Sequence, residues 1–455
     1  MSLNNPVLLA EYAEGCHVDG LGQCIPGSRL KALLDPRHAD RVIFEVLAQT
    51  GQEVDAEMLC LYDNVSAADL RKLTAFPALV DVNLYNCDGL TDLSPLADLD
   101  GVSTITIDGA PALADLSPLI QMPALEMLWL EQCPSLVDAD TIGQLRLTTL
   151  SIRRCRKIDD IGFVRGLSAL KTLWLNLEHL VDLSPLAALP ALEDLSLSDC
   201  HSLRDLSPIQ SLPTLRTLTL VRLDGALQFG PLAAIPSLVR LTLSGQPHQL
   251  DLSTFPPSPG LKSLYITYSA FGRQLDLSPF LALAALRVDA SVADGALEVC
   301  GVGDAETIEF SSIRILSTLR IQDAANLDTL TIERCEDLEA AHLPPARRLI
   351  IGGCARLTSL EMAGGVQKVV LRSDASLALL SALEPNRLEH LELSSLHTIE
   401  TLPALSRFSR LKTIKIEGCS RLTDASALAT VMALETLTIQ RCPSLIERTV
   451  PQHLR

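Results

Sequence analysis

Two cysteines and a histidine near the start of the chain are the residues whose types and spacing come nearest to a metal site. Cys16, His17 and Cys24 could begin a zinc centre, but zinc is usually held by four such ligands and no fourth one stands at a suitable spacing. The remaining histidines are scattered, with no pair four residues apart. We therefore assign no metal and no cofactor, and interpret these three residues as structural or incidental.

Catalytic signatures are the next chemistry to consider. The sequence contains no phosphate-binding loop, dinucleotide fingerprint, H-E-x-x-H motif or nucleophile elbow. An enzymatic site could still lie in residues 1–53, which is a segment too short for most catalytic folds. We therefore expect a protein that is not an enzyme.

Charge and hydropathy narrow the classes of partner. The 455 residues carry a formal net charge of −18, which repels phosphate backbones, and its ordinary role is solubility. No run of about 18 apolar residues could span a membrane. The first residues, MSLNNPVLLAEYAEG, lack the basic and apolar regions of a signal peptide. We expect no nucleic-acid partner, no membrane and a cytoplasmic location.

A phrase of 22 or 23 residues repeats along the chain. Its best copies follow the pattern L-x-x-L-x-L-x-x-C-x-x-L-x-D-L-S-P-L-x-x-L-P-x. Successive copies open at Leu79, Val102, Leu125, Leu147, Leu170, Leu192, Leu215, Leu238 and Leu261. One repeat cannot bury enough apolar surface to fold alone, so neighbouring repeats must share one core.

Each part of the phrase predicts a local structure. The L-x-L alternation indicates a strand with one buried face, and neighbouring copies would pair into one parallel sheet. In D-L-S-P-L, serine before proline suits the N-cap and first residue of a short helix or 3₁₀ turn. In the turn that follows the strand, the same position of the repeat is often cysteine, and we call this position the cysteine slot. It holds Cys87, Cys133, Cys155, Cys200, Cys335, Cys354, Cys419 and Cys442. We expect these thiols to be reduced and structural, as in the cytosol.

These residues resemble the leucine-rich repeats. The DLSPL half is similar to the internalin-like bacterial class, and the cysteine half to the cysteine-containing class of F-box adaptors and plant immune receptors. The resemblance covers about residues 54–455. It implies an α/β fold: a curved, horseshoe-shaped solenoid with a parallel concave sheet and short helices, 3₁₀ turns and loops on the convex side. It also implies that the concave sheet binds proteins.

One motif within the array resembles an enzyme site. Cys335, Glu336 and Asp337 match the Cys-x-Asp site of bacterial leucine-rich-repeat ubiquitin ligases. However, Cys335 occupies the cysteine slot and no ligase domain follows, so we interpret it as structural.

The repeat divides the chain into four parts. Residues 1–53 do not fit the phrase, and we expect a helical cap with helices over Ser28–Leu34 and His38–Gln49, followed by a first strand over Glu57–Tyr62. Residues 54–282 form a regular array. In residues 283–375 apolar couplets arrive every 10 or 11 residues, which indicates strands on both sides of the coil. Residues 376–455 return to regular repeats with a short cap.

The exposed strand positions are the candidate binding site. The two tryptophans of the chain both fall at the fifth position of a repeat, two repeats apart, so their rings should lie roughly 10 Å apart. Exposed tryptophan with arginine is typical of interface hot spots, although the rings could instead only shield the sheet or stack on neighbouring arginines. The candidate residues are Tyr85, Trp129, Glu131, Arg153, Arg154, Trp174, Asn176 and Asp194. A second patch comprises Arg240, Tyr265, Tyr268 and Arg287.

The leading hypothesis is therefore a non-catalytic scaffold or adaptor that binds a protein on its concave sheet. The alternative is a translocated bacterial effector that acts on host proteins through the same surface, and only an export assay would distinguish the two.

Overall fold

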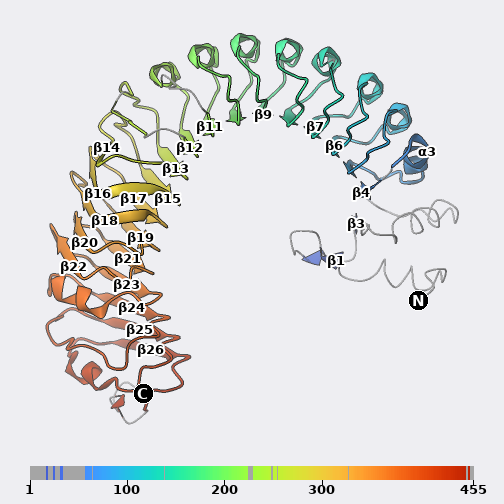
Figure 1. Ribbon diagram of the computed structural model, residues 1–455. Helices are drawn as coiled ribbons and strands as arrows, with labels where there is room; N and C mark the ends of the chain where they lie inside the picture. The colour runs from blue at the N-terminus through green and yellow to red at the C-terminus, as the bar shows by residue number, and fades with distance from the viewer. Residues whose placement is uncertain are drawn as a thin grey trace, which may run out of the picture. The chain divides into compact units, whose positions relative to one another are not determined.

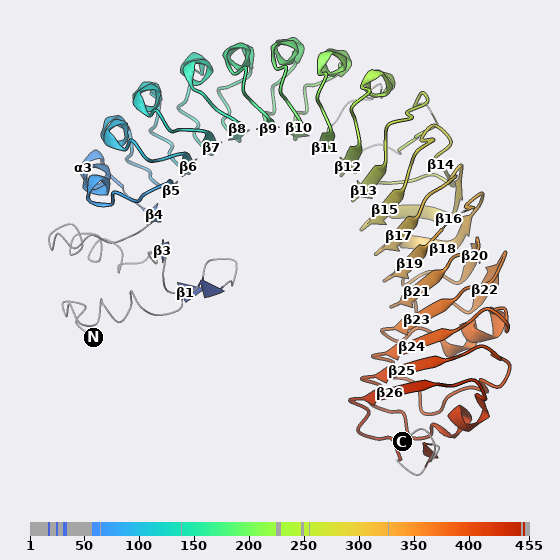
Figure 2. The ribbon, with the colours of Figure 1, turned by 180° about the vertical axis from the view of Figure 1, so that it is seen from behind.

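The computed structural model describes most of the chain from residue 57 onward (Figures 1 and 2). The described ranges are 57–63, 65–137, 139–223, 229–246, 250–253, 255–325, 327–446 and 449–450, with short strands at 17–18, 24–25 and 31–33. The chain divides into two compact units. Unit 1 comprises residues 1–216 and 223–228, and unit 2 comprises residues 217–222 and 229–455.

Unit 1 is built on one parallel sheet with a strand from each repeat. Consecutive strands pair in register, so equivalent positions of successive repeats stand side by side. The strands are β3 (Lys31–Leu33), β4 (Met58–Tyr62), β5 (Asp81–Tyr85), β6 (Thr104–Asp108), β7 (Met127–Glu131), β8 (Thr149–Arg153), β9 (Thr172–Asn176) and β10 (Asp194–Ser198). A separate antiparallel pair joins β1 (His17–Val18) and β2 (Cys24–Ile25).

Short helices form the return path of each coil in unit 1. Figure 1 shows an arc within this unit, with the strands on its inner side and the helices on its outer side. The helices are α3 (Ala67–Arg71) and the 3₁₀ helices η1 (Lys72–Ala75), η2 (Ser94–Asp98), η3 (Ser117–Gln121), η4 (Asp140–Gln144), η5 (Gly162–Gly166), η6 (Ser184–Ala188) and η7 (Ser207–Ser211). The strand and return path enclose an aliphatic core in which most consensus leucines are fully buried.

Unit 2 continues the repeat with two sheets. Its first sheet contains β11 (Thr217–Val221), β12 (Arg240–Ser244), β13 (Ser263–Thr267), β15 (Ala285–Asp289), β17 (Thr307–Ser311), β19 (Thr329–Glu333), β21 (Arg348–Gly352), β23 (Lys368–Arg372), β24 (His390–Ser394), β25 (Thr413–Glu417) and β26 (Thr436–Gln440). Its 3₁₀ helices are η8 (Gly230–Ala234), η9 (Leu377–Ala382) and η10 (Ser426–Thr430).

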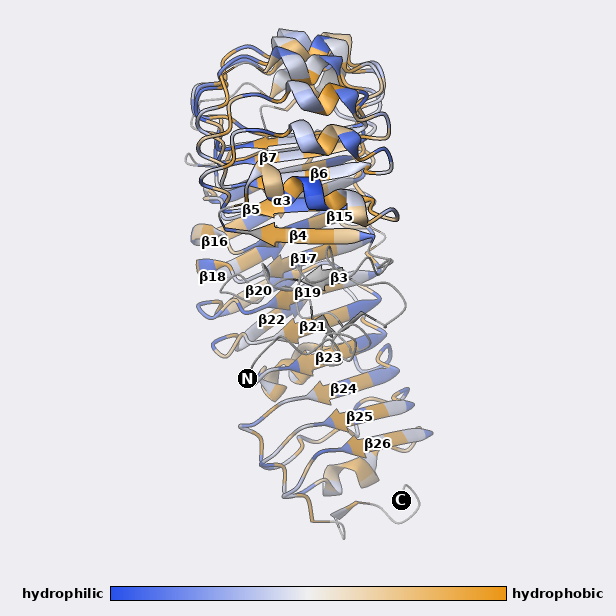
Figure 3. Cartoon of the chain, turned by 90° about the vertical axis from the view of Figure 1, so that its right-hand side faces the viewer, coloured by the Kyte–Doolittle hydropathy of each residue, from blue (hydrophilic) through white to orange (hydrophobic). Residues whose placement is uncertain are grey.

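The second sheet of unit 2 spans the segment for which the sequence indicated strands on both sides of the coil. It contains five parallel strands: β14 (Gln274–Asp276), β16 (Val292–Cys300), β18 (Arg314–Ile321), β20 (Ala340–Leu343) and β22 (Ser359–Met362). Alternate residues such as Ala341 and Leu343 are buried, so this sheet replaces the helices as the second wall of the core. Figure 3 shows apolar and polar residues alternating along strands such as β24 and β25.

The DLSP turn is capped differently from the sequence prediction. The 3₁₀ helix starts at the serine, so the N-cap position falls on the preceding leucine, which has no side chain able to cap. Instead, the aspartate carboxylate accepts a hydrogen bond from the serine N–H at 2.8–2.9 Å in Asp92, Asp115, Asp182, Asp205 and Asp276. These bonds lower the pKa of Asp92, Asp182 and Asp205, because the serine donors stabilise the charged carboxylate. The prediction that serine is the cap was therefore wrong.

The cysteine slot is a hydrogen-bonded position. Each of its eight thiols lies 3.3–3.7 Å from the carbonyl oxygen two residues earlier, to which it donates. In unit 2 the same slot holds Ser269 and Ser291, whose hydroxyls donate to the equivalent carbonyls at 3.0 and 2.9 Å. Other repeats hold an apolar residue in this slot, such as Ala110, Leu223 or Leu396, so burial is its common property and the hydrogen bond forms where a donor is present. Every cysteine in the described part of the chain is free.

The N-terminal expectations are met only in part. The strand predicted over Glu57–Tyr62 is β4 (Met58–Tyr62), but it is not the first strand of the sheet, because β3 precedes it. The prediction of a helix over Ser28–Leu34 was wrong at Lys31–Leu33. These residues form β3, which pairs parallel to β4. Strand pairing with the first repeat has overridden the local helical pattern. The helix expected over His38–Gln49 and the side chains of Cys16, His17 and Cys24 lie outside the described residues.

Candidate functional site

The two tryptophans of unit 1 form one contact on the exposed face of the sheet. Trp129 of β7 and Trp174 of β9 share register with Ser151 of the intervening strand β8. Their ring centroids are 5.0 Å apart at an interplanar angle of 90°, an edge-to-face arrangement. The expected separation of about 10 Å was wrong because both rings lean over the small Ser151, which is only 1% exposed.

Charged side chains flank this ring pair in fixed positions. Glu131, at the end of β7, forms ion pairs with Arg153 at 3.4 Å and with Arg154 at 3.5 Å. Arg154 takes a left-handed conformation with φ of 55° and its N–H donates to the carbonyl of Asn176. The arginines are about half exposed, so Glu131 holds their guanidinium groups in place while they remain accessible.

Burial also affects a neighbouring carboxyl group. Asp108 ends β6 and lies in register with Glu131. Its pKa is raised, first by burial and then by the negative charge of Glu131, although both arginines oppose the shift. Protonation of Asp108 would therefore relieve the repulsion between its carboxylate and that of Glu131.

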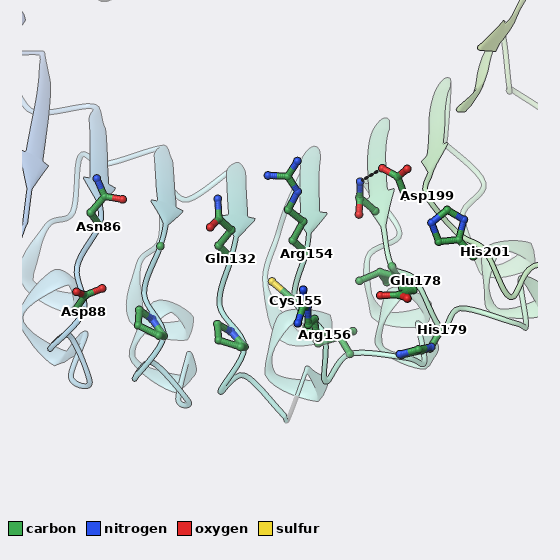
Figure 4. Close-up of a pocket in the computed structure, with 16 residues that line it drawn as sticks. Asn86, Asp88, Gln132, Arg154, Cys155, Arg156, Glu178, His179, Asp199 and His201 are labelled. Atoms are coloured by element: carbon green, nitrogen blue, oxygen red, sulfur yellow. Dashed lines mark hydrogen bonds between the residues drawn. The ribbon is translucent and has the colours of Figure 1, made fainter. Parts of the chain in front are cut away.

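A groove of about 550 Å³ lies beyond the carboxyl ends of these strands (Figure 4). Most strands of unit 1 are followed by one left-handed residue and then the cysteine slot, as in Arg153–Arg154–Cys155. After β9 the left-handed residue is missing, and Asn176 is followed directly by the buried Leu177. Leu177 lines the groove, so the shortened repeat contributes directly to its wall.

The groove wall is polar and mixed in charge. Arg154 and Arg156 line it together with Asp88 and Glu178. The Asn176 side-chain amide, 7% exposed, donates to the Asp199 carboxylate at 2.7 Å and so bridges the shortened coil to the next one. The groove was missed from the sequence. The step from Leu170 to Leu192 is 22 residues, but so is the step from Leu125 to Leu147, where β7 keeps its left-handed residue Gln132.

Cys155 lies at the floor of the groove and is the residue there most capable of chemistry. Hydrogen bonding with the thiol of Cys133 in the preceding repeat lowers its pKa and raises that of Cys133. However, Cys155 is only 1% exposed, and its thiol donates to the Arg153 carbonyl as in every other cysteine slot. We interpret it as a packing residue.

The structure places the other predicted residues as follows. Tyr85 ends β5, two strands from the ring pair, and is half-buried. Asp194 opens β10, in register with Thr172 rather than with Trp174. Arg153, Arg154, Glu131, Trp129 and Trp174 are therefore the residues that the structure brings together, and Asn176 connects them to the groove.

The second predicted patch lies in unit 2 and is more dispersed. Tyr265 of β13 is in register with Arg287 of β15, and Arg287 pairs with Asp289 at 3.7 Å and Glu309 at 3.6 Å. Tyr268 follows the strand with φ of 49° and is 71% exposed. Arg240 opens β12, in register with Ser263. The patch offers one tyrosine–arginine pair but no preformed aromatic cluster.

The described residues contain no group of three or more histidine, cysteine or acidic side chains placed to hold a metal ion. No helix among them is both long and apolar enough to cross a membrane.

The repeat, the in-register parallel sheet and the short helices opposite it define this chain as a leucine-rich-repeat solenoid. No family model matches the sequence, and no curated protein does. Among solved structures, TLR13 in complex with ssRNA13 is similar, with a TM-score of 0.51 and 16% identity over 86% of this chain and 58% of that one. A leucine-rich-repeat protein of Leptospira interrogans has a TM-score of 0.45 and 15% identity, over 87% of this chain and 95% of that one. An internalin (InlF) of Listeria monocytogenes has a TM-score of 0.39 and 17% identity, over 84% of this chain and 92% of that one.

Proposed function

We propose that the chain is a non-catalytic scaffold that binds a protein partner on unit 1, through Trp129, Trp174, Arg153 and Arg154 and the adjoining groove. The observation that carries this proposal is the ring pair held over Ser151. Two large aromatic rings are left half-buried on a sheet whose apolar core is already filled by leucine. Tryptophan and arginine are also the residues most enriched among interface hot spots.

The surface is ordered before a partner arrives. The two rings restrict each other, and Glu131 holds both arginines. A partner therefore does not have to order these side chains on binding, which raises affinity without further contacts. A protruding loop or helix could contact the rings while its polar groups enter the groove.

The test is the double substitution Trp129→Ala with Trp174→Ala. Truncating one true anchor weakens binding by about 2 kcal/mol or more, roughly thirtyfold. Affinity capture with quantitative mass spectrometry should show partners that wild-type protein retains and the variant loses. The control is Thr217→Ala with Thr219→Ala, which changes half-buried residues on the same face of β11 and should leave partner capture unchanged. Partners retained equally by the folded tryptophan variant would refute this site.

Nucleic acid is the partner class that must be separated from protein. TLR13 was solved with an RNA, whereas the net charge of −18 disfavours a phosphate backbone on this chain. Titration of the purified protein with labelled single-stranded RNA distinguishes the two. Tight binding that the tryptophan variant abolishes would replace the protein-scaffold proposal.

We further infer a reducing compartment, because every cysteine in the described part of the chain is free. Burial raises the pKa of Cys87 to about 12 and that of Cys200 to about 11, so these thiols stay protonated and unreactive at neutral pH. Thiol titration should find slow reaction in native protein and nearly complete reaction after denaturation. Several disulfides in protein isolated under anaerobic conditions would contradict this inference.

A further inference from the structure

The last strand of unit 2 that the structure describes, β26, has a free edge. It pairs with β25 on one side and with no other strand of the described part of the chain, and it stands at the end of its row of strands in Figure 2. A free edge is a template for another strand, and soluble proteins usually protect it with charged side chains or proline. The residues of β26, TLTIQ, include neither, so this edge is open to strand pairing.

The apolar core is also open at this end of unit 2. The repeat that contains β26 has five core side chains that are only half-buried: Leu434, Leu437, Ile439, Cys442 and Leu445. The equivalent side chains of the preceding repeat are all 0% exposed: Leu411, Ile414, Ile416, Cys419 and Leu422. Met432, shortly after η10, is 94% exposed. A further layer against this end would therefore bury these side chains, as each repeat buries those of the repeat before it.

Opposite charges flank β26 at its two ends. Glu435 precedes the strand and is exposed, and Arg441 follows it with a side chain that is 81% exposed. In an antiparallel pair of two such strands centred on Thr438, Glu435 of each copy stands opposite Arg441 of the other. The same register sets Leu437 opposite Ile439, and both lie on the core face of the sheet. The edge is therefore complementary to itself in charge and in apolar character.

We propose that this end of unit 2, which comprises residues 432–445 and which we call the β26 edge, binds a second copy of the chain. The two β26 strands pair antiparallel about a two-fold axis through Thr438, perpendicular to the sheet. That axis keeps the core faces of both sheets on the same side, so the half-buried side chains of the two copies meet in one core. Arg441 also pairs with Glu417 of β25 at 3.6 Å, and its guanidinium group has further donors for a second carboxylate. This interface is independent of the tryptophan surface of unit 1.

Sedimentation equilibrium of the full chain between about 1 µM and about 100 µM measures this association. The mass should rise from that of a monomer to that of a dimer and no further. Glu435→Lys sets like charges against each other at both ends of the strand pair and should weaken dimerisation about tenfold, and Arg441→Glu should do the same. The double variant Glu435→Lys with Arg441→Glu should return to within about threefold of wild type. This rescue requires position 435 of one copy to face position 441 of the other, so it reports the antiparallel register.

The matched control is Glu306→Lys, the same substitution at the equivalent exposed position, immediately before the interior strand β17 of unit 2. It should leave dimerisation within about twofold of wild type. A monomer at every concentration would overturn the proposal and assign the β26 edge to a different partner. A double variant no better than the single variants would also overturn it, as would assemblies larger than a dimer, which indicate head-to-tail addition. Circular dichroism of each variant verifies that the fold is retained.

Discussion

The contact between Trp129 and Trp174 joins residues that are two repeats apart, and it should be measurable in the free protein. The perturbation is a double-mutant cycle of Trp129→Ala, Trp174→Ala and the combined variant. If the rings stand edge to face as they do here, with centroids 5.0 Å apart, each single substitution removes the same ring–ring interaction. The combined variant should then lose less stability than the sum of the two single variants.

The geometry sets the size of this effect. An aromatic pair in edge-to-face contact contributes about 0.5–1.5 kcal/mol beyond its buried area. The rings also cover Ser151, which is 1% exposed, so the coupling should lie in the upper half of that range. For two residues this far apart on a sheet and not in contact, the losses in free energy of unfolding add to within about 0.3–0.5 kcal/mol. The expected coupling is therefore about 1 kcal/mol.

Urea unfolding at 25 °C, followed by far-ultraviolet circular dichroism, gives the four free energies of unfolding. Because repeat arrays can unfold in parts, hydrogen exchange at the amides of β8 supplies a local measure of the same coupling. A control cycle pairing Trp129→Ala with Thr217→Ala should be additive. Coupling below about 0.3 kcal/mol in both measurements would show that the rings do not touch in solution, and would remove the preformed anchor from the proposed site.

Three further outcomes follow from the repeat itself. Cys200→Ser should lose less stability than Cys200→Val in urea unfolding, because a hydroxyl can replace the thiol as donor to the carbonyl two residues back, as it does elsewhere in this slot. Asp205→Ala should lower Tm near pH 7, with the difference vanishing as the pH falls through the depressed pKa of that carboxyl, because the ionised form stabilises the turn only above it. A constant difference down to pH 2 would contradict this. Gly352→Ala should destabilise by about 1–3 kcal/mol, since its Cβ would stand 2.7 Å from Arg372 Cγ; this loss should shrink in an Arg372→Ala background.

The architecture was predictable because the repeat reports it many times. A buried leucine or other aliphatic residue recurs at equivalent positions from one repeat to the next, so chance agreement is excluded and the in-register sheet follows. Local capping was harder to predict. Serine before proline suits an N-cap, but the 3₁₀ helix begins at that serine, and only the aspartate two residues earlier can reach its N–H.

The sequence places both tryptophans on the exposed face of the sheet, but it does not predict how their rings meet. Strand spacing determines the positions of the Trp129 and Trp174 backbones. It does not determine the positions of their rings, because side-chain rotation can move a ring by several ångströms. In the sequence the groove corresponds only to a repeat that is one residue short after Asn176. Its meaning depends on the left-handed residue that other strands place there, such as Arg154, and a spacing alone does not reveal that conformation.

The same device operates in both units, and it suggests how a solenoid builds a rigid surface. In unit 1, Ser151 lets two rings meet above it. In unit 2, Gly352 lies between Glu333 of β19 and Arg372 of β23, and these two side chains form an ion pair across it. A small residue on the middle strand brings together side chains two repeats apart, which strand spacing alone would separate by about 10 Å. In a parallel in-register sheet, an exposed side chain normally contacts only those on the two adjacent strands. A contact across a small residue therefore links three coils, whereas an ordinary contact links two. Such contacts should therefore stiffen the exposed face where they occur, and a partner that uses them contacts a cluster already assembled by the repeat.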